Sequence, residues 1–144
     1  MMTKALDILL VEDNSADARL IREALREGRV ASTLSVVHDG VEALAYLRRE
    51  DPYAHTRRPD LVLLDLNLPM KSGHEVLTEL KNDPQLWRIP VVVLSAHHEQ
   101  EVVRATYDLH ANCYIAKPAD PDLFASVGRS INSFWHTVAQ LPAY

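Results

Sequence analysis

Acidic side chains stand directly after two apolar runs of the sequence. Glu12 and Asp13 follow Ile8–Val11, and Asp65 follows Leu61–Leu64. Three carboxylates held a few ångströms apart repel one another unless a cation lies between them. Oxygen-only ligands suit a hard ion, and Mg²⁺ is the best match because it retains several waters and requires only one or two carboxylates. These acids therefore predict a Mg²⁺ site, provided that the fold brings them together.

A hydroxyl group and a lysine stand at equivalent places farther along the chain. Ser95 follows Val91–Leu94, and Lys117 follows Cys113–Ala116. Each residue alone has an ordinary interpretation, because serine often ends a strand and lysine is usually a solvated charge. The paired acids alone are equally suited to capping a helix. The placement of all five side chains after apolar runs is what indicates a common site.

The elements that must position these side chains alternate along the chain. Short β-rich runs are separated by helical patterns, which is the signal of βαβ units and a mostly parallel sheet. The predicted strands are Leu6–Val11, Thr33–Val37, Leu61–Leu64, Val91–Leu94 and Cys113–Ala116. The central strands are apolar without alternation, so helices should cover both faces of the sheet. The sequence thus predicts an α/β fold with a doubly wound five-stranded parallel sheet, whose ligand site lies beyond the carboxyl ends of the strands.

Length and composition limit the class of protein. A chain of 144 residues, 47% of them hydrophobic, is long enough for one domain with its own core. The net charge of −5 offers no basic surface for nucleic acid, and the one cysteine excludes an internal disulfide and fits a reducing compartment. The apolar runs are too short to span a bilayer or to form a secretory signal. We expect a single cytoplasmic domain over residues 1–144, with no output domain, nucleic-acid partner or membrane contact.

Two segments depart from the regular alternation. Residues 48–59 are polar, contain Pro52 and are expected to form an extended loop. Residues 121–139 are expected to form a long C-terminal helix with Pro121 in its first turn. Apolar residues recur in it at helical spacing: Phe124, Val127, Ile131, Phe134 and Val138. The first turns of this stripe should pack on the core.

Four separated stretches of the sequence form a recognisable pattern. They are Leu9–Asn14, Leu63–Pro69 with Gly73 behind it, Leu94–Ala96, and Tyr114–Ala116 with Lys117-Pro118. In this order they resemble the receiver domain of bacterial two-component response regulators, and the resemblance covers essentially the whole chain. It implies a flavodoxin-like (βα)5 arrangement with strand order 2-1-3-4-5, and a signalling protein rather than an enzyme with turnover on other substrates.

Softer features point to one branch of that family. They are the lengthened Arg48–Pro59 loop, the stretch Tyr107–Ile115 and a C-terminal helix ending Phe134-Trp135. In these the chain is most similar to the small single-domain regulators paired with phytochrome-type histidine kinases. The resemblance implies such a kinase as partner, and a homodimer through the fourth helix, fifth strand and fifth helix. Phe134, Trp135 and Val138 extend beyond the usual end of a receiver helix, so we expect them to cover the partner copy.

The resemblance also implies a role for each acid. Asp65 is expected to be the phosphoacceptor, whose carboxylate attacks a phosphohistidine of the kinase and becomes an aspartyl phosphate. Asp13 and Asp65 are expected to bind Mg²⁺ directly, together with the backbone carbonyl of Asn67. Glu12 is expected to hold a metal-bound water.

The remaining motif residues are expected to act on the phosphoryl group or on the signal. Lys117 is expected to contact a phosphoryl oxygen, and Ser95 to hydrogen-bond another once the group is in place. The resemblance implies that the displacement of Ser95 would vacate space for Tyr114 to move inward. The signal would then pass to the face formed by the fourth helix, fifth strand and fifth helix. Lys117–Pro118 is expected to be a cis peptide bond.

Other classes of function fit the residues less well. A phosphatase of the haloacid-dehalogenase kind needs a second aspartate two residues after the first as general acid, and that position is Asn67. A flavodoxin-like cofactor carrier needs a phosphate loop where Glu12 and Asp13 would repel phosphate. A receiver that binds partners without phosphorylation remains a further alternative. The seven histidines lack the spacing of a zinc site, and His97 is a candidate for lining the route of the water that removes the phosphoryl group.

Overall fold

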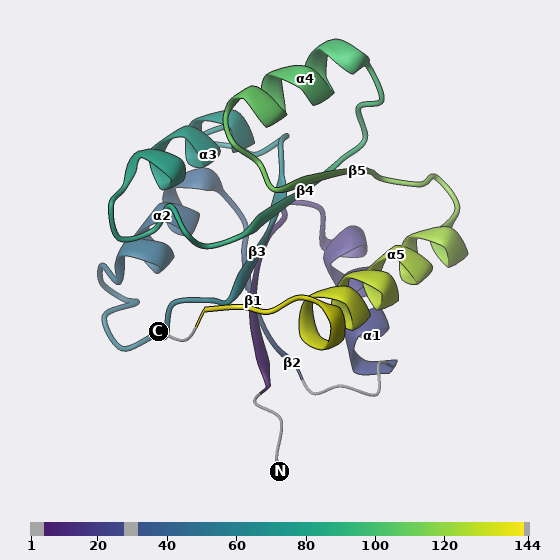
Figure 1. Ribbon diagram of the computed structural model, residues 1–144, viewed down its shortest axis with the longest axis horizontal. Helices are drawn as coiled ribbons and strands as arrows, with labels where there is room; N and C mark the ends of the chain where they lie inside the picture. Colours follow the sequence, from purple (N-terminus) through teal and green to yellow (C-terminus); the bar gives the residue numbers. More distant parts are fainter. Residues whose placement is uncertain (1–4, 28–31, 143–144) are drawn as a thin grey trace.

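Five parallel strands form one sheet in the predicted order. The computed structural model describes residues 5–27 and 32–142. Its strands are β1 (Leu6–Val11), β2 (Ser32–Val37), β3 (Leu61–Asp65), β4 (Val91–Ser95) and β5 (Cys113–Ala116). They pair in the order β2-β1-β3-β4-β5, with β3 at the centre and β1 between β2 and β3 (Figure 1). This confirms the doubly wound flavodoxin-like sheet.

Helices cover both faces of the sheet. They are α1 (Ser15–Glu27), α2 (Gly40–Arg48), α3 (Gly73–Asn82), α4 (Gln100–Asp108) and α5 (Pro121–Ser133). Helices α1 and α5 pack together on one face, whereas α2 packs against α3 on the other and α4 contacts β5 (Figure 1). None of the helices within the described ranges has the length and apolar character needed to cross a bilayer.

Neighbouring residues of the same strand pack into hydrophobic clusters on opposite faces of the sheet. Leu9 and Val62 belong to the cluster that α2 and α3 cover, whereas Leu10 and Leu63 belong to the cluster that α1 and α5 cover. All four side chains are at most 1% exposed. Because successive strand residues point to opposite faces, an unbroken apolar run is required where both faces are covered.

Gly73 allows α3 to begin directly against the end of β3. A Cβ atom at this position would lie 2.4 Å from the backbone oxygen of Asp65 and 2.5 Å from the Cα of Leu66. The amide of Gly73 also donates to the carbonyl of Leu66, at 2.9 Å. Ser72 caps the helix by accepting a hydrogen bond from the amide of Glu75. The loop that follows Asp65 therefore packs tightly against the start of α3.

The connection between α2 and β3 corresponds to the expected long loop. The described structure has no helix or strand between Arg48 and Leu61. Its one cis peptide bond within the described residues is Asp51–Pro52, so the expectation of a cis bond at Lys117–Pro118 is wrong. With the bond trans, which is the lower-energy isomer, Lys117 already reaches the acids at the sheet edge.

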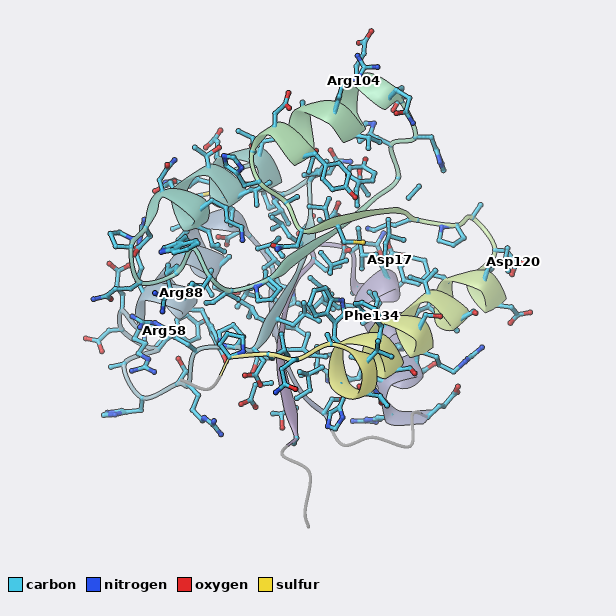
Figure 2. All side chains as sticks on the ribbon, in the orientation of Figure 1. Asp17, Arg58, Arg88, Arg104, Asp120 and Phe134 are labelled. Carbon is cyan, nitrogen blue, oxygen red and sulfur yellow. The ribbon has the colours of Figure 1, made fainter. Side chains whose placement is uncertain are left out.

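The C-terminal helix continues past α5 as a π-helical turn, Phe134–Val138. Within this turn the three residues expected to cover a partner behave differently. Trp135 packs against the core cluster beneath α1 and α5, whereas Phe134 is 48% and Val138 is 70% exposed. Phe134 is labelled at the end of α5 in Figure 2. Phe134 and Val138 are therefore the apolar side chains that this end of the molecule offers to solvent.

Candidate functional site

The register of the sheet brings the strand-end residues together. Val11 of β1 pairs with Leu64 of β3, so Glu12 and Asp65 each stand one residue beyond a paired position. Both side chains are buried, with 1% and 6% of their residues' surface exposed. In β5, Ala116 pairs with Ser95, and Lys117 follows it at the same edge. The parallel order thus places residues from distant segments at one end of the sheet.

The ammonium group of Lys117 lies among three carboxylates. Its Nζ is 2.8 Å from Oε2 of Glu12, 2.9 Å from Oδ2 of Asp17 and 3.2 Å from Oδ2 of Asp65. An ammonium group has three N–H donors, so all of them have a carboxylate partner here. Only 10% of the Lys117 side chain is exposed. The lysine is therefore the cation that holds the acids together in this structure.

Asp17 is a member of the cluster that the sequence analysis missed. It lies in the first turn of α1, with its amide donating to Oδ1 of Asn14. An acid in the first turn of a helix is ordinarily explained by the helix dipole. The position of Asp17 in the chain could have indicated this contact. Helix α1 begins at the carboxyl end of β1, so its first turn borders the same edge of the sheet as Asp65.

Burial and mutual repulsion dominate the electrostatics of the acids. Burial, and then the neighbouring Asp65, raises the pKa of Glu12 to about 7, against the opposing effect of Lys117. Burial alone would lower the pKa of Lys117, but its hydrogen bonds to Glu12 and Asp17 raise that pKa above its ordinary value. Lys117 therefore stays charged at neutral pH, whereas the pKa of Glu12 lies near neutral pH even with Lys117 beside it.

The expected metal ligands are only partly gathered. Within the described residues, no three Asp, Glu, His or Cys side chains are placed to share one metal ion. Asp13 lies exposed at the rim, while Oδ1 of Asp65 accepts a hydrogen bond from the amide of Asn67 at 3.2 Å. The oxygen donors nevertheless fit Mg²⁺, because this ion keeps several waters and needs only one or two carboxylates.

Ser95, His97 and Tyr114 form a second linked group beside the acids. Ser95 is fully buried, and its Oγ accepts a hydrogen bond from the amide of His97 at 3.2 Å. The hydroxyl of Tyr114 donates to the carbonyl of His97 at 2.9 Å. The ring of His97 faces Asn67, with Nε2 3.5 Å from Nδ2. The loop after β4 thus connects the acid edge to β5.

Tyr114 is also tied to α4 through its backbone. Its amide donates to the hydroxyl of Tyr107, at 3.1 Å, on the helix that follows the loop. The Tyr114 ring is partly buried against the core cluster beneath α2 and α3. A change at Ser95 could therefore reach α4 and β5 through hydrogen bonds that this structure contains.

Comparisons with known proteins agree with this geometry. A family model described as the response regulator receiver domain matches residues 8–127. Response regulator Rcp1 of Synechocystis sp. is 48% identical over 137 residues, which cover 94% of this chain and 92% of Rcp1.

Solved structures give the same result in three dimensions. The phosphorylated cyanobacterial phytochrome response regulator RcpA has a TM-score of 0.94 at 51% identity, covering 97% of this chain and 100% of RcpA. The Mn²⁺-bound form of Rcp1 has a TM-score of 0.92 at 45% identity, covering 96% of this chain and 99% of Rcp1. With its sheet order and strand-end cluster of acids and lysine, this chain belongs to the response regulator receiver domain family.

Proposed function

We propose that this chain accepts a phosphoryl group from a sensor histidine kinase onto Asp65, in a Mg²⁺-dependent reaction. The observation that carries the proposal is the position of the Asp65 carboxylate. It stands at the carboxyl end of β3 with 6% of the residue exposed, and its Oδ2 lies 3.2 Å from the Lys117 ammonium. A carboxylate in this position combines a nucleophilic oxygen with a fixed cation for the charge on the incoming group.

The transfer exchanges one phosphorus bond for another. A carboxylate oxygen of Asp65 attacks the phosphorus atom of a phosphohistidine, the P–N bond breaks, and its electron pair returns to the imidazole ring of the kinase. Lys117 binds one phosphoryl oxygen, and the hydroxyl of Ser95 donates to another. Little else is asked of the protein, because phosphoryl transfer depends mainly on positioning and on neutralising oxygen charge.

The metal belongs to the same site. Asp13, Asp65 and the backbone carbonyl of Asn67 would hold Mg²⁺ directly, and Glu12 would hold it through a water. When bound, Mg²⁺ neutralises charge on the phosphoryl oxygens. The Mn²⁺-bound form of the similar protein Rcp1 supports a divalent ion in this proposal.

The output is a switched protein–protein surface. Once Ser95 turns to the phosphoryl group, its hydrogen bond with the amide of His97 is lost, and the loop that accepts the Tyr114 hydroxyl moves. Tyr107 carries this change to α4 through the Tyr114 amide. We expect the face formed by α4, β5 and α5 to be the surface that changes.

A phytochrome-type kinase in the cytoplasm is the partner that the comparisons support, because RcpA is described as a cyanobacterial phytochrome response regulator. The test is incubation of this protein with labelled phytochrome-type and unrelated histidine kinases under red and far-red light. We expect Mg²⁺-dependent label transfer, faster from the phytochrome-type kinase and changed by the light. Equal rates from all kinases in both lights would contradict the pairing, and no transfer from any kinase would contradict the function.

The exposed apolar end of the molecule is expected to form a homodimer contact. Replacing Phe134 and Val138 together by Ala removes most of the exposed apolar surface of the π-helical turn. We expect the double variant to sediment as a monomer at concentrations where the wild type is a dimer. Val41→Ala on α2, where the side chain is 47% exposed, is the matched control and should leave the dimer intact. A wild type that is monomeric with and without a phosphoryl mimic would overturn the dimer.

A further inference from the structure

Asp17 holds Lys117 without having a place in the proposed phosphoryl transfer. Its carboxylate is the most exposed of the three that contact the ammonium, with a side-chain exposure of 24%, against 1% for Glu12 and 7% for Asp65. It comes from α1, exactly 100 residues before Lys117 in the chain. Figure 2 labels Asp17 at the start of α1, close to the loop that leaves β5.

The contact is more than a helix-end effect. A first-turn acid stabilises a helix from a solvated position, whereas the Asp17 carboxylate is turned onto a lysine that is 10% exposed. At 2.9 Å this is a charge-assisted hydrogen bond of ordinary length. Since the three N–H groups of Lys117 are all used, any new phosphoryl contact must replace one of its present bonds or share a donor with it.

We infer that Asp17 is a positioning residue, which holds the Lys117 ammonium and offsets its charge while no phosphoryl group is present. The inference rests on the proposed function, because it concerns the same lysine. When the negative charge of Asp17 is removed, Lys117 attracts an anion bound to Asp65 more strongly. The same change makes the site more repulsive to a divalent cation. Asp17 therefore has opposite effects on the two ligands.

The charge can be removed with little change in shape by Asp17→Asn. We expect this variant to bind Mg²⁺ alone about threefold more weakly and, at saturating Mg²⁺, to bind beryllofluoride about fivefold more tightly. The reason is that the lost unit charge lies 2.9 Å from the ammonium group that also contacts Asp65. Titration calorimetry measures the first affinity, and ¹⁹F NMR of bound beryllofluoride measures the second. Glu23→Gln removes the same charge from the exposed side of α1 and should change neither.

A structural role for Asp17 would give a different result. If Asp17 only supports α1, Asp17→Asn would lower the affinity for both ligands or for neither, and either result overturns the inference. In a Lys117→Met background the Asp17 carboxylate is released to solvent, so the gain in beryllofluoride affinity from Asp17→Asn should fall below about twofold. A gain that persists in full would also overturn it. Asp17→Ser serves as the second variant if the asparagine fails to fold.

The proposed function is tested separately by the wild type. If wild-type protein in Mg²⁺ binds no beryllofluoride, the phosphoacceptor proposal itself fails. If the wild type binds it and Asp17→Asn binds it equally well, only the role of Asp17 fails.

Discussion

Asp65→Asn is expected to abolish phosphorylation, lowering the rate of label incorporation by ~10³-fold or more, as removal of a catalytic nucleophile does in enzymes. The amide has no anionic oxygen to attack phosphorus, although its size and its place at the end of β3 are unchanged. The measurement is acid-labile label on the protein after incubation with a histidine kinase or a small phosphodonor in Mg²⁺. Retention of label on the variant would assign the phosphoacceptor to another residue.

The same variant carries its own control for folding. Asp65 is one of the groups that raise the pKa of the buried Glu12, so its replacement removes a repulsion from the metal-free protein. We therefore expect Asp65→Asn to unfold at a temperature no lower than the wild type in the presence of a chelator. A variant that loses the label and is markedly less stable would leave the loss attributable to misfolding, which circular dichroism would detect.

Lys117→Met is expected to destabilise the metal-free protein by about 3–5 kcal/mol, the usual cost of removing one partner from a buried ion pair. The methionine keeps much of the aliphatic stem but leaves Glu12 and Asp65 without their shared cation. Urea unfolding in a chelator measures the effect. Lys71→Met is the matched control, because Lys71 pairs with Glu79 while both side chains are about one-third exposed. That control should cost no more than about 1 kcal/mol.

The cost of Lys117→Met should depend on pH, with a sign that follows from Glu12. The pKa of Glu12 is raised from 4.5 to about 7 in the folded protein, so folding takes up a proton and stability falls as the pH rises through this interval. Lys117 opposes that rise, so the variant should lose more stability above pH 7 than the wild type does. A loss that is the same below and above this pKa would contradict the lysine's role as counter-ion to Glu12.

The sheet was predictable because its signal is local and strong. Both ends of β1 and β5 agree with the predicted strands, and β2, β3 and β4 differ by one residue. Long apolar runs with no alternation have few alternatives to a strand covered on both faces. The placement of Glu12, Asp65 and Lys117 at one edge then follows from parallel pairing, since the carboxyl ends of all strands meet there.

The features that could not be predicted from the sequence depend on which side chains come into contact in the folded protein. Asp17 has a sufficient local explanation at the start of a helix, and only the contact with Lys117 reveals another role. The sequence pattern places Trp135 with Phe134 at the end of the last helix, and only the structure shows that Trp135 is half-buried against the protein's own core. Neighbouring side chains on a helix point in different directions. A π-helical turn also changes the helical spacing from which exposed and buried positions are predicted.

The most direct test of the central claim is chemical identification of the phosphorylated residue. Wild-type protein is incubated with a small phosphodonor, with Mg²⁺ or with a chelator, and then reduced with borohydride, which converts an aspartyl phosphate to homoserine. Peptide mass spectrometry should find homoserine at position 65 in the Mg²⁺ sample and aspartate there in the chelator sample. Homoserine at another position, or equal conversion in both samples, would contradict this account.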